Sequence, residues 1–241
     1  MLESLALFFE NIGIVKAAEQ LEYLSDIPNL LFAVWETLYA PLAATVFAYI
    51  IGLPLGVLLV TGEPEGIRPM PRWLMATLNT VINLLRSIPF LILMIMAFPL
   101  ARIIVGTTVG TTACIVPLVI AAFPFVARLV ETSLREVNPN IIEAAQSMGA
   151  TPFQIMWKVM LPESVPSLLS NFTTAITTIL GYTAMSGIIG GGGLGKIAIN
   201  YGYYRYKYLV MYVAVILLII IVQLFQSAGT KAAIKSDKRL K

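Results

Sequence analysis

The 241-residue sequence contains no histidine and a single cysteine, Cys114. Histidine is the commonest general base and metal ligand near neutral pH, so its absence removes the usual parts of a hydrolytic or metal site. One cysteine cannot form a disulfide within the chain, and Cys114 lies in an apolar run, where a small buried side chain is expected. The sequence therefore predicts no catalytic, cofactor or metal site in this chain.

Charge is also scarce. Charged residues make up 12% of the sequence, and hydrophobic residues make up 58%. The 16 basic and 13 acidic residues are scattered, which argues against a nucleic-acid partner. Lipid is a better solvent than water for so apolar a chain. The sequence therefore predicts an all-α integral membrane protein surrounded by membrane lipid.

Five apolar stretches are long enough to cross a bilayer. They run within residues 38–60, 77–100, 103–127, 164–190 and 208–228, the third starting after the Gly and Thr cluster at 106–112. Arg86 is the one charge near the interior of a span, and we expect it to reach the cytosolic surface, or to pack against the inner bundle or the loop at residues 138–162. No acidic residue falls inside these stretches, which disfavours a proton- or sodium-coupled carrier.

The chain divides into three parts. Residues 1–37 are an acidic segment with six carboxylates and one basic residue, residues 38–230 are the transmembrane domain, and residues 231–241 are a basic tail. Five spans place the two ends on opposite sides, with ten basic residues on one side and five on the other once Arg86 is set aside. The positive-inside rule then predicts an extracytoplasmic N-terminus and a cytosolic C-terminus.

The cytosolic connector at residues 138–162 has the sequence pattern of two short helices. Asn138 and Pro139 are typical of a helix start, because proline suits the first turn. Gly149 lies where a helix ends in a left-handed residue. We call residues 138–162 the elbow.

The second helix of the elbow has its own signals. Thr151 is the predicted cap, Pro152 occupies the first turn, and Gln154 completes a capping box. Pro162 is predicted to end this helix. Both helices carry more apolar residues than a solvated connector needs, namely Ile141, Ala145, Met148, Phe153, Met156, Trp157 and Met160. They either pack beneath the membrane bundle or dock into a groove on a cytosolic partner.

The elbow also contains a spaced motif, which is Glu143-Ala144-Ala145, then Gly149, then Val159-Met160-Leu161-Pro162. It resembles the EAA loop of ABC importer permeases, which reads Glu-Ala-Ala, three residues, Gly, nine residues, Ile-x-Leu-Pro. Only Val159 departs from that pattern. Further segments are similar to methionine ABC transporter permeases over roughly residues 35–230: 86–90, 128–131, 149–152, 181–187, 192–195 and 201–203.

The resemblance implies a type I ABC importer permease fold with the elbow helices as coupling helices, in the bacterial cytoplasmic (inner) membrane as a multi-pass protein. It implies a homodimer of permeases, two cytosolic ABC ATPase subunits that hold ATP and Mg, and an extracytoplasmic substrate-binding lipoprotein. The implied ATPase-coupling residues are Glu143, Ala144, Ala145, Gly149, Thr151, Pro152, Leu161 and Pro162. In this interpretation the chain is a transport subunit and not an enzyme, and ATP drives alternating access.

The fourth span combines polar side chains with flexible glycines, and we expect it to line the pathway. Its candidate pore residues are Tyr182, Met185 and Ser186. Met185 is a candidate gate because an unbranched thioether fills a gap and moves aside at low cost. Ordinary helix packing is the alternative for Met185. Two other functions stay open, which are an ABC importer for another amino acid or small solute, and a secondary carrier.

Two glycine patterns point to packing. Residues 190–196 fit the P-loop spacing G-x-x-x-x-G-K, but residue 197 is Ile and not the Ser or Thr that holds Mg²⁺. The stretch also closes a membrane span, so we expect a flexible or tightly packed turn. In the first span Gly52-x-x-x-Gly56 fits close packing of two helices.

Overall fold

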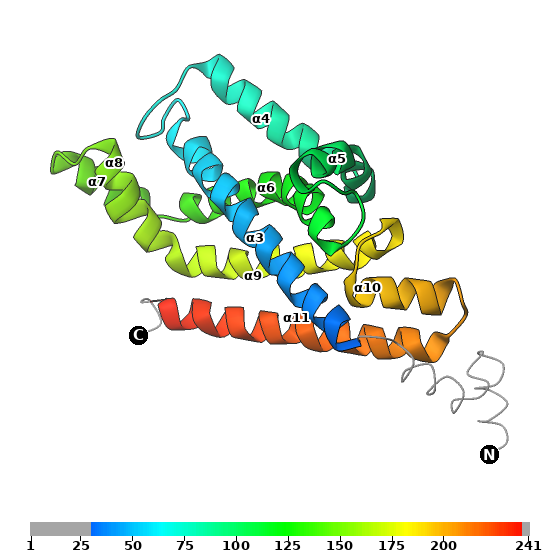
Figure 1. The fold of residues 1–241 in the computed structure, drawn as a ribbon. Helices are drawn as coiled ribbons and strands as arrows, with labels where there is room; N and C mark the ends of the chain where they lie inside the picture. Colours follow the sequence, from blue (N-terminus) through cyan, green and yellow to red (C-terminus); the bar gives the residue numbers. More distant parts are fainter. Residues whose placement is uncertain (1–29, 238–241) are drawn as a thin grey trace.

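The computed structural model describes residues 30–237, and every regular element in that range is a helix (Figure 1). The elements are α3 (Leu30–Thr61), α4 (Arg72–Ser87), α5 (Phe90–Val105), α6 (Thr111–Arg135), α7 (Pro139–Ser147), α8 (Pro152–Ile155), the π-helix η1 (Met156–Met160), α9 (Leu161–Ser186), the 3-10 helix η2 (Gly187–Ile189), α10 (Gly193–Ile197), the π-helix η3 (Ala198–Tyr203) and α11 (Tyr208–Ser236). The predicted all-α class is confirmed.

Four helical stretches are long and apolar enough to cross a membrane, and they are residues 30–61, 111–135, 152–189 and 208–236. A fifth crossing exists only if α4 and α5 count together, because they are bent by 109°. The span predicted within residues 77–100 is therefore broken into two helices. Pro89 causes the break, since the residue before a proline is driven to extended backbone, and Ile88 has φ −77° and ψ 127°.

Helix α3 begins at Leu30, eight residues before the predicted start of the first span. Glu36 therefore lies inside this helix, and the expectation that no acidic residue occurs within a span is wrong. A carboxylate is tolerated in this helix because Glu36 accepts hydrogen bonds from Thr111 and Gly193, which are distant in the sequence. Residues 1–29 of the predicted acidic segment lie outside the described residues.

Two other helices run further than predicted. Helix α6 starts at Thr111, close to the predicted start, and continues to Arg135 because charged residues of its last two turns pair with one another. Helix α11 starts at Tyr208, as predicted, and ends at Ser236. Lys231 and Lys235 of the predicted basic tail are therefore helical, and residues 238–241 lie outside the described part.

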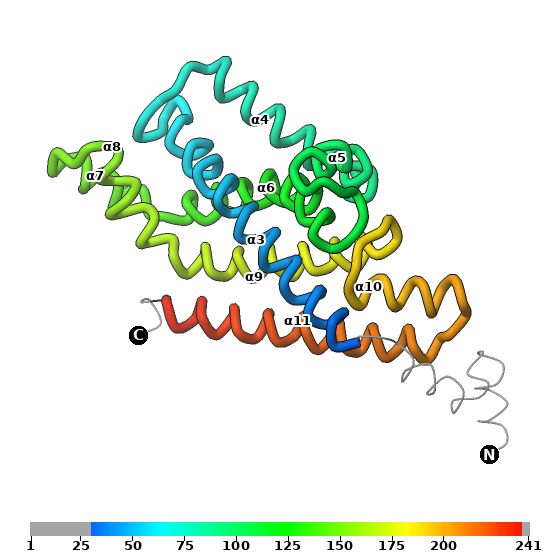
Figure 2. Tube along the Cα trace, viewed as in Figure 1, coloured from blue at the N-terminus to red at the C-terminus, as the bar shows by residue number. Residues whose placement is uncertain are grey.

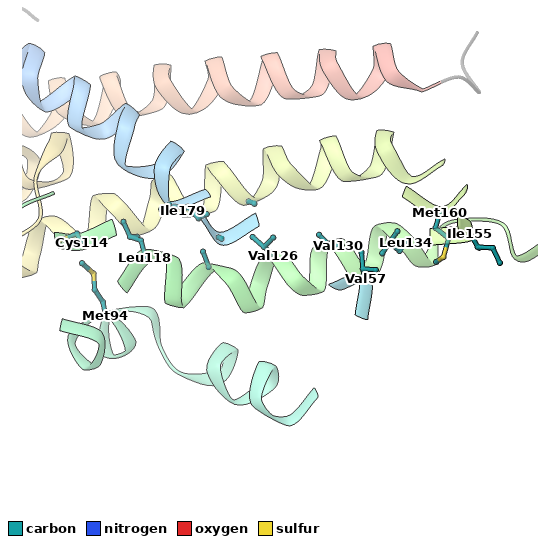
Figure 3. Close-up of a cluster of buried hydrophobic side chains, with 14 of the residues drawn as sticks. Val57, Met94, Cys114, Leu118, Val126, Val130, Leu134, Ile155, Met160 and Ile179 are labelled. Atoms are coloured by element: carbon teal, nitrogen blue, oxygen red, sulfur yellow. The ribbon is translucent and has the colours of Figure 1, made fainter. Parts of the chain in front are cut away.

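Helix α6 is the centre of the bundle. Gly52 and Gly56 place α3 directly against it, because a Cβ atom at Gly56 would lie 2.6 Å from both the Ala127 carbonyl oxygen and the Val130 side chain. The predicted role of this glycine pair in helix packing is confirmed. Figure 3 shows the resulting core, which follows α6 from Cys114 to Leu134 and meets the elbow at Met160.

The bundle has two ends (Figure 2). The elbow lies at one end, near the last turns of α3, α6 and α11, and we call this the elbow end. The start of α3, residues 190–195 and helix α10 lie at the opposite end, which we call the far end. Because α9 runs between them, one helix connects both sites considered below.

Candidate functional site

The first elbow helix, α7, begins and ends as its sequence predicts. The Asn138 side chain accepts a hydrogen bond from the Asn140 backbone N–H at 3.0 Å, and Pro139 fills the first turn. Gly149 has φ +77°, which confirms the left-handed conformation. The Ala150 N–H donates to the Ala145 carbonyl at 3.1 Å across this turn, so the end of α7 is well satisfied.

The second elbow helix starts with the predicted capping box. The Gln154 N–H donates to Thr151 Oγ1 at 3.3 Å, and the Thr151 N–H donates to Gln154 Oε1 at 2.8 Å. Pro152 occupies the first turn. With a left-handed glycine on one side and a reciprocal cap on the other, the turn between the two helices has one preferred geometry.

Pro162 does not end the second helix, contrary to the prediction. Helices α8, η1 and α9 form one stretch of 38 residues when η2 is included. In a regular α-helix the ring of Pro162 would meet the carbonyl four residues earlier. The π-turn η1 avoids this clash, since the Leu161 N–H bonds to Met156, five residues back, and the helix is wider there. The elbow is thus continuous with a membrane span.

The apolar side chains of the elbow divide between two environments. Ala145, Ile155 and Met160 are buried in the core beneath the bundle. Met148, Phe153 and Trp157 are 81%, 69% and 61% exposed, and the last two rings stack with centroids 6.4 Å apart. One face of the elbow therefore packs beneath the bundle, as the first interpretation predicts, and the other face is exposed. Docking of the exposed face on a partner stays a prediction.

The remaining predicted coupling residues lie around this exposed face. Glu143, Ala144, Thr151, Pro152 and Pro162 are exposed, and Leu161 is half-buried. An apolar groove of about 540 Å³ separates the second elbow helix from the last turns of α3. The structure thus brings all the predicted coupling residues to one end of the molecule (Figure 1).

A polar network next to the elbow was not anticipated from the sequence. Arg128 donates to Glu131 at 2.6 Å, to Asn79 at 2.8 Å and to Asn83 at 2.9 Å. Glu131 also accepts from Arg135 at 2.9 Å. The network joins α4 to α6, and Arg135 extends it to Glu63 in the loop after α3. The sequence shows the spacing of the charged residues on α6, but nothing near Asn79 and Asn83 in the sequence indicates that they pair with Arg128.

The predicted pore residues lie toward the far end of α9. Met185 is 44% exposed, and Tyr182 stacks on Phe90 at the start of α5 with ring centroids 4.2 Å apart. Ser186 is buried and donates to the Thr183 carbonyl at 2.7 Å. Met185 and Tyr182 share one face of α9, whereas Ser186 faces the interior of the chain. The pore role of all three stays a prediction.

Residues 190–195, which we call the glycine loop, form a tightly packed turn, as expected. Gly190 and Gly193 have φ +99° and +80°. A Cβ atom at Gly187, just before the loop, would lie 2.5 Å from the Lys196 backbone nitrogen. Side chains of Glu36 and Thr37 bind the loop from α3, a long-range contact that sequence reasoning missed.

Comparison with known proteins gives a consistent picture. The family described as binding-protein-dependent transport system inner membrane component matches residues 52–231. The probable D-methionine transport system permease protein MetI of Vibrio cholerae is 49% identical over 213 residues, which are 87% of this chain and 93% of that protein. The Escherichia coli K12 D-methionine transport system permease protein MetI is 46% identical over 158 residues, which are 66% of this chain and 72% of that protein.

A solved structure is similar over nearly the whole described chain. It belongs to a study of inward-facing conformations of the MetNI methionine ABC transporter, and it matches with a TM-score of 0.84 and 44% identity. The match covers 87% of this chain and 97% of the solved chain. The fold and the sequence thus lead to the same group of proteins.

We expect Arg128→Met to loosen α4 from α6. The substitution leaves Asn79, Asn83 and Glu131 without their shared donor, and such a loss costs about 1–3 kcal/mol. Amide hydrogen exchange should accelerate in residues 72–87 of the purified protein. Arg86→Met is the matched control, because Arg86 is exposed on α4. Equal exchange in the two variants would contradict a role for the network.

Proposed function

Because this chain belongs to the family of binding-protein-dependent transport system inner membrane components, we propose that it is the permease subunit of an ATP-driven ABC importer for methionine. One observation carries the proposal. The elbow presents exposed aromatic side chains at the end of a helix that continues into a membrane span. A partner that binds this face therefore acts directly on the transmembrane part.

The proposed assembly contains two copies of this chain and two cytosolic ABC ATPase subunits. The MetNI complex is the support for this arrangement. ATP and Mg would be bound by the ATPase subunits, and an extracytoplasmic substrate-binding lipoprotein would deliver the solute. The exposed face with Met148, Phe153 and Trp157 supplies the apolar surface that an ATPase groove would bury.

The mechanism is alternating access. ATP-driven closure of the ATPase subunits would move the two elbows, and α9 would carry the displacement toward Met185. The distance is large, since Leu161 and Met185 are 24 residues apart in the helix, about 36 Å at 1.5 Å per residue. A packed helix transmits such a movement because its core contacts resist bending.

We propose that Met185 and Tyr182 form the gate of the pathway, with Ser186 behind them. Met185 is exposed on the face of α9 that also carries Gly181. Tyr182 is held by its stack on Phe90, so α5 supports this part of α9 from the side. In a dimer, the same face of the second copy would complete the closure.

The proposed orientation places the elbow end in the cytosol of a bacterial cell and the far end outside its cytoplasmic membrane. Basic residues belong to the segments that meet at the elbow end, namely the loop after α3, the start of α4, the end of α6, η1 and the last turns of α11; they include Arg68, Arg72, Arg135, Lys158, Lys231 and Lys235. This bias follows the positive-inside rule. Single cysteines at Lys196 and Lys235 should react with an impermeant maleimide from opposite sides of sealed vesicles. Reaction of both from one side would contradict the orientation.

Gly149→Val should abolish coupled transport. A β-branched residue in the left-handed region is strained by on the order of 1–2 kcal/mol, so the elbow helices would change their relative tilt. Space is not the reason, since a Cβ atom at Gly149 meets nothing within 4 Å. The assay is ATP-dependent uptake of labelled methionine by the complex reconstituted with its ATPase and binding protein.

Gly149→Asn is the matched control, because asparagine tolerates the left-handed region. It should retain uptake, whereas Gly149→Val should lose either the ATPase or the coupling of hydrolysis to uptake. Full uptake by Gly149→Val would show that the elbow is not the coupling element. Uptake of another solute in place of methionine would assign a different importer, and uptake without the ATPase would assign a secondary carrier.

Met185→Ala should leave the complex assembled and make its closed pathway leaky. The smaller side chain opens a gap where a thioether fills the space between copies. The measurement is efflux of labelled methionine from proteoliposomes without ATP, and Met211→Ala on α11 serves as a control for a methionine outside the proposed gate. An unchanged leak together with lower thermal stability would mean that Met185 is only a packing residue.

A further inference from the structure

The far end of the bundle contains a carboxylate inside a span, at Glu36 of α3. Thr111 at the start of α6 donates to Glu36 Oε1 at 2.5 Å, and the backbone N–H of Gly193 donates to Glu36 Oε2 at 2.8 Å. The next residue, Thr37, accepts from the N–H of Leu194 at 2.8 Å. Two neighbouring side chains of α3 thus satisfy two consecutive amides at the start of α10, which have no partner within that helix.

The glycine loop that receives these bonds is also tied to α6 and α9. The Gly110 N–H donates to the Gly190 carbonyl at 2.9 Å, and the Gly191 N–H donates to the Ser186 carbonyl at 2.9 Å. Ser186 is the last residue of α9 and follows Met185 directly. Glu36 therefore lies at a junction that fixes the end of α9 relative to α3 and α6.

The junction has no room for a solute. The cavity beside Glu36, Thr111 and Ser186 has a volume of about 10 Å³, enough for about one water molecule. A Cβ atom at Gly195 would also collide with the backbone of Ala184 in α9. The Glu36 carboxylate therefore binds groups of this chain and not a solute, since both of its oxygens accept hydrogen bonds from this chain.

We propose that Glu36 is a positioning residue that holds the pathway closed at the far end. Its two hydrogen bonds, with those of Thr37, anchor the glycine loop and so keep the Met185 segment of α9 in place. The proposal rests on the proposed function only in taking α9 as the wall of the pathway. Under this proposal Glu36 differs from the ionisable groups of ion-coupled carriers, because Glu36 accepts hydrogen bonds and does not exchange protons.

Substitutions at Glu36 distinguish geometry from charge. Glu36→Ala removes both acceptors and leaves the Gly193 N–H unpaired. Glu36→Gln keeps the shape, since its amide oxygen can accept from the Gly193 N–H and its amide nitrogen can donate to the Thr111 hydroxyl. A positioning role therefore predicts that Glu36→Gln behaves almost like the wild type. A proton-carrying role predicts that it behaves like Glu36→Ala.

The experiment measures access to the pathway without ATP or substrate. A cysteine is introduced by Gly181→Cys, where a Cβ atom meets nothing within 4 Å, on the same face of α9 as Met185 and one turn away. Cys114→Ala removes the native thiol. The full chain, assembled with its ATPase in sealed right-side-out vesicles, is treated with an impermeant maleimide, and Lys196→Cys reports the exposed far end.

We expect slow labelling at residue 181 when Glu36 is intact and labelling about tenfold faster with Glu36→Ala, which corresponds to about 1.4 kcal/mol in the closed–open equilibrium. Glu36→Gln should restore slow labelling, and residue 196 should react equally in all variants. Equal rates for wild type and Glu36→Ala, or no rescue by Glu36→Gln, would overturn the proposal. Because no transport is measured, a complex that carries another solute gives the same result.

A second pair of variants tests the proposal if the Glu36→Ala protein does not insert into the membrane. Thr111→Val is nearly isosteric and removes only the hydroxyl that donates to Glu36. Thr112→Val is the matched control, because Thr112 is exposed and its hydroxyl lies 3.5 Å from the hydroxyl of Tyr39, not at Glu36. Faster labelling with Thr111→Val alone supports the proposal. Equal labelling with both variants contradicts it.

Discussion

A backbone N–H or C=O group without a partner costs several kcal/mol in hydrocarbon, and this constraint governs where the chain departs from helix. Three departures within or beside the spans illustrate it, which are the Ile88–Pro89 bend, the π-turn η1 and the glycine loop. Proline has no N–H to satisfy at the bend, and the π-turn pairs each amide one residue further back. The glycine loop depends on side chains of another helix, Glu36 and Thr37.

These departures divide the chain into separate helical stretches. The π-turn lets the elbow and α9 form one helical stretch in spite of Pro162, while Gly149 and the Thr151 cap set the direction of the elbow. Helix α6 packs against α9, and the glycines of α3 allow α3 to approach α6 closely. In the proposed mechanism, a movement at the elbow passes along α9 toward Met185. In the same proposal, the Glu36 junction resists that movement at the far end.

The elbow could be predicted because its geometry is set by local interactions. The contacts between distant segments could not be predicted. Caps, Pro152 and Gly149 act over a few residues, so their geometry follows from the sequence. The prediction that Pro162 ends the helix was wrong because a π-turn precedes it. The hydrogen bonds of a π-turn reach five residues back, and helix propensities do not reveal them. Glu36 was overlooked because its partners at Thr111 and Gly193 are 75 and 157 residues away. One sequence without its relatives contains no signal for such pairs, and the same holds for Arg128 and Asn79.

Whether α9 acts as a lever is tested most directly by pulsed electron spin resonance distances in the assembled complex. Spin labels replace Lys158, exposed in η1, in one sample and Ile188, 46% exposed beyond α9, in another, with Cys114 replaced by Ala. Each label reports the distance between the two copies of the chain. On binding of a non-hydrolysable ATP analogue, the distance at 158 should shorten while the distance at 188 lengthens. A shorter distance at 158 with no change at 188 would contradict transmission through α9.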